Sequence, residues 1–301
     1  MEIRQLEHFL AVVEERNFTH AAELLRISQS GLSSSIKALE DELGVALFTR
    51  TTRRVEVTAA GEALFPEATR TVAAATAARA AVDSVAGLVT GTVAVGSESC
   101  PGVIHLARDL ASFRRSHPGI DMRLLIDGSA TLLDRVSAGE LDVACVVPVG
   151  PVPSGIRLSE LGTEQIVVLS RADHPVAVRP DAVPHGVSPS EVQDETFVDF
   201  LPGASSRVIT RRLFASEGLD YRVGLEVNDV HTLLDLVEEG LAIGVVPMSI
   251  ARKRPELAAT PLSSAPQSSA THPWTVYVAT RENPSPAALA LADHFTRSAA
   301  G

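Results

Sequence analysis

The chain has 301 residues, of which 45% are hydrophobic and 21% are charged. This balance is ordinary for a soluble globular protein and excludes a mostly disordered chain. At about 150 residues per domain, the length predicts two domains, with one or three as alternatives. The net charge of −11 argues against a protein that coats nucleic acid by bulk charge, but it is compatible with one local DNA-reading module.

The acid excess lies late in the chain. Residues 1–58 carry seven basic and nine acidic side chains, and residues 59–88 carry two and three. The other 17 basic and 25 acidic side chains fall in residues 89–301. Any binding to DNA must therefore depend on where a few cations are placed.

The sequence shows no pattern of metal ligands. Cys100 and Cys145 lack a CxxC partner, which excludes a disulfide scaffold or a four-cysteine zinc site. The nine histidines show no HxxxH spacing, and we expect no metal and no cofactor. No signal peptide, membrane-spanning run, GxSxG, P-loop or GxGxxG is visible. We expect a cytoplasmic protein that does not bind membranes.

Three helices are predicted before residue 45. Apolar residues at helical spacing predict the first over residues 3–16. Thr19 is predicted to cap a second, short helix. Ser28 is predicted to cap a third helix that ends at Leu43, with Gly44 in the left-handed conformation after it. The side chains expected to face inward on the second and third helices are Ala21, Ala22, Leu24, Leu25, Leu32, Ile36, Leu39 and Leu43.

Two short strands are predicted next, over residues 46–50 and 55–58, with a charged tip between them. Three helices and a β-wing in so short a segment are typical of a winged helix-turn-helix. The third helix turns hydroxyls outward, suited to phosphates and base edges, while the wing arginines suit the duplex backbone. We predict a DNA-binding surface of Thr19, Gln29, Ser30, Ser33, Ser34, Lys37, Arg50, Arg53 and Arg54. The acidic run at 40–42 is expected to point away from DNA; the alternative is a helical bundle whose polar face is merely solvated.

A long helix is predicted over residues 59–88, with Thr58 as its cap. Apolar and small residues repeat at intervals of four and three, which is a heptad seam. A helix of roughly 28 residues extends about 40 Å and cannot bury itself in the preceding domain. We expect it to pair with a second copy through Leu64, Ala68, Thr71, Ala75, Ala78 and Val82. Pro66 is expected to bend or weaken its first two turns.

From residue 91 strands alternate with helices, which predicts an α/β fold in two lobes. We assign residues 89–162 and 268–301 to lobe I and residues 163–267 to lobe II. The predicted strands are 92–95, 121–126, 141–147, 165–169, 197–200, 223–227, 242–246 and 274–279. The predicted helices are 101–117, which Pro101 begins, 130–138, 206–216, 230–239 and 286–297. The Ser/Pro/Ala-rich segment 263–273 is interpreted as a crossover or loop.

Residues 1–60 contain a long gapless string of matches to one family. It runs Phe9…Phe18-Thr19-x-Ala21-Ala22, then Gln29-Ser30-x-Leu32-Ser33-x-x-Ile36-x-x-Leu39-Glu40-x-x-Leu43-Gly44-x-x-Leu47-Phe48-x-Arg50, then Thr58-x-x-Gly61. This string resembles the DNA-binding domain of the LysR-type transcriptional regulators, and the later α/β pattern fits that family's effector domain. Ser34 departs from the arginine that family members often carry there, which removes one expected phosphate or guanine contact.

The resemblance implies a mechanism as well as a fold. A dimer, usually assembled into a tetramer, presents two winged helices to dyad-symmetric double-stranded promoter DNA. The C-terminal region resembles a type 2 periplasmic binding protein, with a small-molecule cleft between two lobes. The effector biases the arrangement of the tetramer. RNA polymerase is a further partner if the protein is an activator.

The effector site is expected beyond the carboxyl ends of strands, as in other open α/β sheets. By resemblance, four loops face one cleft, and the predicted contacts are Ser97, Ser99, Cys100, Gly102, Gly128, Ser129, Leu201, Pro202, Gly203, Val246 and Pro247. Helix N-termini after the first two loops suit a carboxylate effector, whereas Glu98 in the same loop would repel an anion. The alternative is that these serines, glycines and prolines are only turn residues.

Three other interpretations were weighed against this one. Cys100 near a helix N-terminus would have a lowered pKa and could sense oxidants, but no resolving cysteine is evident, which favours a neutral thiol lining the cleft. A solute-binding protein would carry a signal peptide and no winged helix. An α/β enzyme would show a nucleophile–base or metal cluster, and none stands out.

Overall fold

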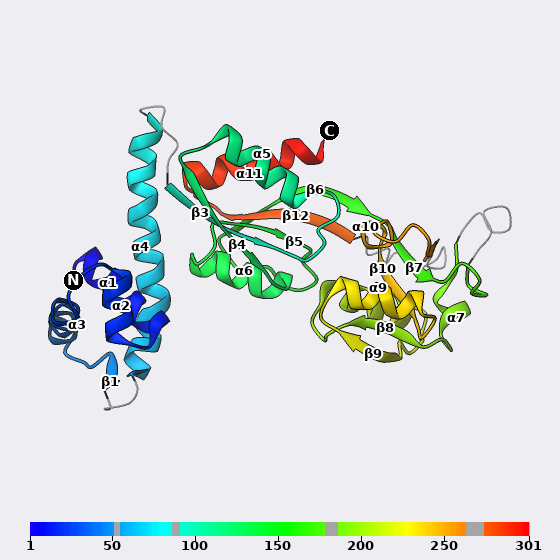
Figure 1. The fold of residues 1–301 in the computed structure, drawn as a ribbon, viewed down its shortest axis with the longest axis horizontal. Coiled ribbons are helices and arrows are strands. Elements are labelled where there is room, and N and C mark those ends of the chain that lie inside the picture. The colour runs from blue at the N-terminus through cyan, green and yellow to red at the C-terminus, as the bar shows by residue number, and fades with distance from the viewer. Residues whose placement is uncertain (51–54, 86–90, 178–185, 263–273, 301) are drawn as a thin grey trace.

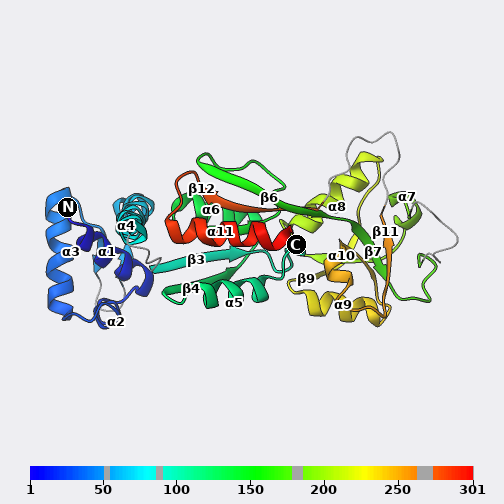
Figure 2. The same cartoon turned by 90° about the horizontal axis from the view of Figure 1, so that it is seen from above.

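A computed structural model describes residues 1–50, 55–85, 91–177, 186–262 and 274–300. A helical N-terminal part with a wing comes first, one long helix follows, and two sheet-containing lobes complete the chain (Figure 1). Seen from above, these parts lie in a row, with the N-terminal helices and the second lobe at opposite ends (Figure 2). Within the described ranges no helix is long and apolar enough to span a membrane.

The N-terminal part matches the predicted winged helix. Helices α1 (Ile3–Glu15), α2 (Phe18–Leu24) and α3 (Gln29–Leu43) enclose one apolar core, with strands β1 (Phe48–Arg50) and β2 (Val55–Val57) paired antiparallel beside it. Both predicted ends of α3 are confirmed. Ser28 Oγ accepts the Gly31 N–H at 3.1 Å, and Gly44 takes φ 69° just after the helix.

Two expectations about these helices are wrong. Asn17 caps α2 in place of Thr19, because Asn17 Oδ1 accepts the Thr19 N–H at 2.8 Å and the helix begins at Phe18. Leu24 and Leu43 are 60% and 40% exposed, although the periodicity predicts that they face inward. Each is the last residue of its helix, so the apolar repeat there continues past the end of the packed core.

Helix α4 (Ala59–Val85) begins where the sequence predicts. Thr58 Oγ1 accepts the Gly61 N–H at 3.1 Å, which satisfies one free donor of the first turn. The helix then continues through Pro66. Gly61 is required by close packing, because a Cβ there would lie 2.5 Å from the carbonyl oxygen of Leu47, beside the wing.

Only part of the predicted dimer seam on α4 is exposed to solvent. Ala68 is 1% exposed and belongs to the N-terminal core, so its predicted place in a dimer seam is wrong, and Leu64 is partly covered by the same core. Thr71 and Ala78 are exposed, and Ala75 is half-buried. The side chain of Val82 lies outside the description.

Lobe I contains strands β3 (Gly91–Ser97), β4 (Ile120–Ile126), β5 (Val143–Val146), β6 (Ile156–Glu164) and β12 (Trp274–Arg281), and helices α5 (Leu106–Ser116), α6 (Ser129–Ala138) and α11 (Pro286–Ala299). The sheet order is β4-β3-β5-β12-β6, with β3 parallel to β4 and β5 and with β12 antiparallel to β5 and β6. Helices α5 and α11 cover one face and α6 covers the other (Figure 1).

Lobe II contains strands β7 (Ile166–Ser170), β8 (Phe197–Phe200), β9 (Val223–Val227), β10 (Ile243–Pro247) and β11 (Ala258–Pro261), and helices α7 (Pro189–Val192), α8 (Ser205–Ser216), α9 (Val230–Glu238) and α10 (Met248–Ala251). The sheet order is β11-β7-β10-β8-β9. The chain enters this lobe between β6 and β7, and β12 brings it back to lobe I. The predicted α/β fold with two lobes is confirmed.

The main difference from the predicted elements lies after β3. The sequence predicts a helix that begins at Pro101, but α5 begins at Leu106. Gly102 takes φ 81°, a left-handed conformation that a right-handed helix cannot contain, and the Val103 N–H bonds to the Pro101 carbonyl oxygen at 3.0 Å in a tight turn. The sequence patterns do not predict strand β6, the short helices α7 and α10, or strand β11. The residues of β6 are largely polar, and this strand pairs with β12. The predicted wing tip and the 263–273 loop lie outside the described residues.

Candidate nucleic-acid interface and ligand cleft

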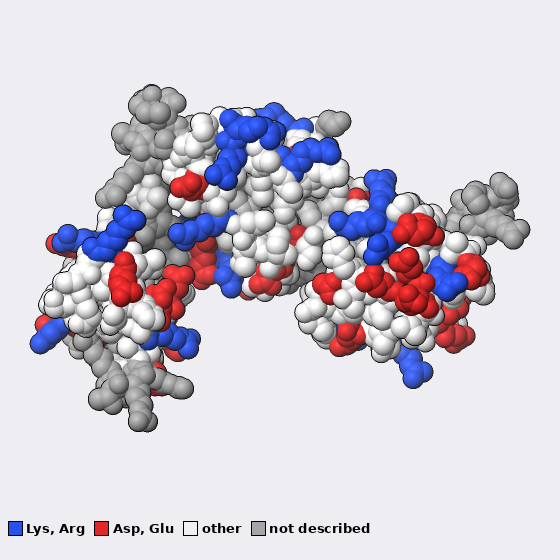
Figure 3. Space-filling view, viewed as in Figure 1, with Lys and Arg blue, Asp and Glu red and all other residues white. Residues whose placement is uncertain are grey.

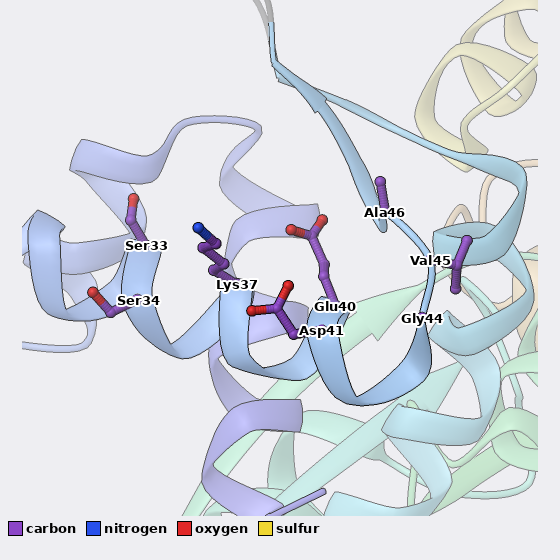
Figure 4. A pocket seen from close by; sticks show the side chains of 8 residues that line it. All are labelled: Ser33, Ser34, Lys37, Glu40, Asp41, Gly44, Val45 and Ala46. Atoms are coloured by element: carbon purple, nitrogen blue, oxygen red, sulfur yellow. The ribbon is translucent and has the colours of Figure 1, made fainter.

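The outward face of α3 borders a shallow hollow on the N-terminal part (Figure 4). Side chains of α3 project toward it, and the segment leading to the wing closes its other side. Its lining is Ser33, Ser34, Lys37, Glu40, Asp41, Gly44, Val45 and Ala46. Two hydroxyls and one ammonium group therefore lie together on an open helical face, which is what contacts to phosphates and base edges require.

The predicted DNA-binding residues are only partly described. Gln29, Ser30, Ser34 and Lys37 are exposed on α3, as Thr19 is on α2, and Ser33 is half-buried. Gln29 Nε2 donates to Ser33 Oγ at 3.0 Å, which orients both side chains. Arg50 ends β1, but nothing is stated of its side chain, and Arg53 and Arg54 lie outside the described residues.

The three acidic residues at the end of α3 lie in different surroundings that the sequence does not reveal. Glu40 Oε1 accepts the backbone N–H groups of Leu47 at 2.8 Å and Phe48 at 3.2 Å, and this ties β1 to α3. Asp41 lines the same hollow as Lys37. Glu42 forms an ion pair with the N-terminal ammonium of Met1.

A cleft of about 530 Å³ lies between the two lobes. Its lining comes from the loops after β3, β4, β8 and β9, from the starts of α6, α8 and α9, and from α10 and β12. The residues are Glu98, Ser99, Cys100, Ile126, Asp127, Gly128, Ala130, Thr131, Phe200, Leu201, Pro202, Gly203, Ala204, Ser206, Asn228, Val230, Ile250 and Trp274. The volume is within the range of sites for small molecules, about 300–1,000 Å³.

Six of the predicted effector residues line the cleft, and five do not. Ser99, Cys100, Gly128, Leu201, Pro202 and Gly203 line it, whereas Ser97, Gly102, Ser129, Val246 and Pro247 do not. Ser97 is fully buried, with its Oγ donating to the Glu98 carbonyl oxygen at 2.8 Å. Gly102 packs against Glu164 and Ser249, and Val246 and Pro247 are buried within β10. Position after a strand is therefore not enough to turn a side chain toward the cleft.

Ser129 is turned into an internal network centred on Glu98. Ser129 Oγ and Ser129 N–H donate to Glu98 Oε1 at 2.5 and 3.2 Å, and Ser205 Oγ donates to the same oxygen at 2.6 Å. The Val147 N–H donates to Ser129 Oγ at 2.7 Å, and the Val147 carbonyl accepts from Ser205 Oγ at 3.0 Å. Ser129 begins α6 of lobe I and Ser205 begins α8 of lobe II, so one carboxylate joins the two lobes at the cleft.

The two cysteines have thiols rather than thiolates. Burial raises the pKa of Cys100, with a smaller opposing effect of Lys253. Burial raises the pKa of Cys145, inside β5, to about 12. Because α5 begins at Leu106, the helix N-terminus that would lower the pKa of Cys100 is not beside it. Among the described residues, no group of three His, Cys, Asp or Glu side chains is arranged to hold a metal ion.

The charges are unevenly distributed on the face shown in Figure 3. Arginines gather at the top of lobe I, and acidic side chains are most frequent on lobe II. The described residues of the N-terminal part carry both signs, and they form no continuous basic surface on this face. This agrees with the segment counts and leaves DNA binding to a few placed cations.

A winged helix joined through a long helix to two α/β lobes around a cleft defines a ligand-responsive DNA-binding regulator. The family model for the LysR substrate binding domain matches residues 86–300, and that for the bacterial regulatory helix-turn-helix protein, lysR family, matches residues 3–62. The chain belongs to the LysR family of transcriptional regulators. It is a DNA-binding transcriptional regulator with a domain for a small-molecule effector.

Known proteins agree with this assignment. The transcriptional regulator ShiR of Corynebacterium glutamicum (strain R) is 35% identical over 249 residues, which cover 81% of this chain and 82% of that protein. A full-length OxyR variant from Pseudomonas aeruginosa shares the fold, with a TM-score of 0.76 at 24% identity over 98% of this chain and 94% of that one. Full-length CbnR complexed with its target DNA gives a TM-score of 0.64 at 25% identity, over 99% and 100% of the two chains.

Proposed function

We propose that this regulator reads its DNA site with α3 and the wing, and responds to a small molecule bound between its lobes. The observation that carries the proposal is the cleft of about 530 Å³, which lies between the lobes of a chain that also presents an open α3 face. In this proposal residues 1–58 bind DNA and residues 59–88 link the parts. Lobe I comprises 89–162 and 268–301, and lobe II comprises 163–267.

DNA contact is proposed for the N-terminal half of α3. Ser30, Ser33, Ser34 and Gln29 supply hydrogen bonds to base edges and phosphates, and Lys37 supplies one phosphate charge. On the wing we propose phosphate contacts from Arg50, Arg53 and Arg54. The tether from Glu40 to Leu47 and Phe48 supports this proposal, because it fixes the start of the wing relative to α3.

Effector contact is proposed for the cleft residues that the sequence also predicts, namely Ser99, Cys100, Gly128, Leu201, Pro202 and Gly203. Large apolar side chains support a ligand there, because Ile126 and Leu201 line the cleft yet remain 46% and 49% exposed. Apolar side chains gathered in a concave surface mark binding sites. A ligand that contacts both lobes stabilises one arrangement of the lobes relative to others. Through this shift, binding in the cleft affects the DNA-binding domain.

Self-association is proposed through the open part of α4, with Thr71, Ala75, Ala78 and Val82 as the contacts. The exposure of Thr71 and Ala78 on a long helix supports it. We further propose that the protein acts without catalysis, in the cytoplasm where its DNA target lies.

The two lysines of the chain provide a matched test of the DNA-reading face. Fluorescence anisotropy measures binding of the full-length protein to a duplex from upstream of its own coding region, over a range of salt concentrations. Lys37→Ala is expected to weaken binding about tenfold and to reduce the slope of log affinity against log salt by about 0.9 per lost phosphate contact. Lys253→Ala, in lobe II, is expected to leave both unchanged. Equal slopes for the wild type and Lys37→Ala would contradict the proposal.

A further inference from the structure

The charged groups that line the cleft between the lobes have one sign. Among the described residues, the lining contains two carboxylate side chains, Glu98 and Asp127. As described, it contains no arginine, lysine or histidine. Lys253 interacts with the Cys100 thiol but does not line the cleft. An anionic effector would therefore lie against two carboxylates without a cation to offset them.

Three donors at the starts of α6 and α8 that would suit an anion are already used by the protein, whereas the Nε1–H of the cleft-lining Trp274 has no partner among the described residues. The N–H groups at a helix N-terminus attract negative charge, and α6 and α8 both begin at the cleft. Here the backbone N–H and the hydroxyl of Ser129, together with the hydroxyl of Ser205, donate to Glu98 Oε1. An effector carboxylate would have to displace this internal carboxylate, which is held from both lobes.

The second oxygen of Glu98 is open to a ligand. The three hydrogen bonds from Ser129 and Ser205 all end on Oε1, and no described residue donates to Oε2, while the side chain lines the cleft. Asp127 uses Oδ1 to accept the Gly128 N–H at 2.8 Å, which leaves its other oxygen without a donor among the described residues. Two acceptor oxygens that carry charge are thus available in one cleft, and a charged N–H donor makes the strongest hydrogen bond to such groups.

Much of the remaining wall is apolar, although Ser99, Thr131, Ser206 and Asn228 also line the cleft. Phe200, Leu201, Ile250 and Trp274 line the cleft together with Ile126 and Val230. An aliphatic or aromatic body is stabilised against such walls by about 25 cal/mol for each Å² removed from water. The cleft therefore combines acidic acceptors with space for a hydrophobic group.

We infer that the effector is an organic cation that carries N–H donors on an apolar body, with its ammonium or guanidinium group bound by Glu98 and Asp127. This inference rests on the proposed function, which makes the cleft the effector site. Burial raises the pKa of Glu98 because loss of hydration disfavours its charge, against the opposing hydrogen bonds of Ser129 and Ser205. A bound cation would favour the charged form of Glu98, so the ligand and this charge would stabilise each other.

Matched probes that differ only in charge test the inference. We would measure binding of the full-length protein by calorimetry to tryptamine, tryptophol and indole-3-acetate, and to the corresponding amine, alcohol and carboxylate on phenethyl and hexyl scaffolds. At least one amine is expected to bind at least tenfold more tightly than its alcohol, with its carboxylate weakest. Glu98→Gln keeps the size of the side chain and is expected to remove most of the preference for the amine over the alcohol.

The outcomes separate the inference from the proposed function. Ala130→Trp fills the cleft, and amine binding that is lost in this variant supports both. Carboxylate binding that exceeds amine binding and is lost in Ala130→Trp would overturn the cation preference and leave the cleft as the effector site. Amine binding that survives Ala130→Trp would lie outside the cleft and overturn both. Failure of every amine in the panel to bind would overturn the inference.

Discussion

Ser205 Oγ, on α8 of lobe II, donates a hydrogen bond of 2.6 Å to Glu98 Oε1 of lobe I. The same oxygen accepts from Ser129 at the start of α6, so one carboxylate holds the first turns of helices from both lobes. Glu98 also lines the cleft. A ligand that binds Glu98 would therefore act directly on the contact between the lobes.

The contact between the lobes can be measured through Ser205→Ala. The substitution removes a buried hydroxyl that donates to Glu98 and to the Val147 carbonyl, and we expect it to lower the free energy of unfolding by about 1–2 kcal/mol. Urea denaturation followed by circular dichroism gives the value. Ser216→Ala is the matched control, because its hydroxyl bonds only to Leu213 on the same helix. Equal losses for the two variants would show that the Ser205 contact has no special role.

The two acids at the end of α3 should have opposite effects on DNA binding. Glu40→Ala removes the acceptor of two wing N–H groups, so we expect weaker binding through a displaced wing. Asp41→Asn removes a negative charge beside Lys37, so we expect binding a few times tighter at low salt, and a smaller gain at high salt. Anisotropy titrations of both variants on one duplex make the comparison. Changes in the same direction would contradict the separate roles.

Asp199 should make stability depend on pH. It is fully buried beneath Tyr221, and burial raises its pKa from 3.8 to about 6. The folded state binds its proton more tightly than the unfolded state, so the associated stability is full below about pH 4 and is lost as the pH rises through about 6. We expect Asp199→Asn to be more stable than the wild type at pH 8, by about 1–3 kcal/mol, and equal to it near pH 4.

A second aspartate provides the control for this effect. Asp229 is an exposed cap whose pKa is lowered by the Thr232 N–H, so its stabilising effect is present at neutral pH and is lost as the pH falls. Asp229→Asn should therefore be less stable than the wild type at pH 8. Urea unfolding of the three proteins at pH 4 and pH 8 gives the signs. A gain from Asp199→Asn that is independent of pH would contradict the assignment of the buried charge.

The open part of α4 should control assembly. Ala78→Arg places a long charged side chain on the proposed seam, and we expect sedimentation velocity to show dissociation at micromolar concentrations. Thr76→Arg changes an exposed residue of the same helix away from the seam repeat and should leave the assembly unchanged. If the two variants sediment alike, the seam lies elsewhere.

Local signals in the sequence account for much of the fold. The capping hydroxyl of Ser28 and the left-handed Gly44 mark both ends of α3, and each works within a few residues of itself. Gly102, by contrast, forms a left-handed turn that the sequence does not reveal. Pro101 precedes it, and proline is equally suited to a helix start and to a loop. The resulting shift of α5 removes one of the two helix N-termini on which the predicted anion site depends.

The cleft depends on contacts that no local pattern contains. Ser205 lies 107 residues from Glu98 in the chain, and Ser129 lies 31 residues away. The sequence places Glu98 and Ser129 in facing loops but does not show that they satisfy each other. Because of this pairing, Ser129 does not line the cleft, whereas the Glu98 carboxylate does.

One titration tests directly whether the cleft controls DNA binding. The tightest-binding amine of the indole, phenethyl and hexyl series is added to the wild type and to Ala130→Trp on the upstream duplex, and anisotropy and DNA footprints are recorded. We expect the amine to change the affinity or the footprint of the wild type at the concentrations at which it binds, and to leave those of Ala130→Trp unchanged. An identical response of both proteins, or no response of the wild type at saturating amine, would contradict the account.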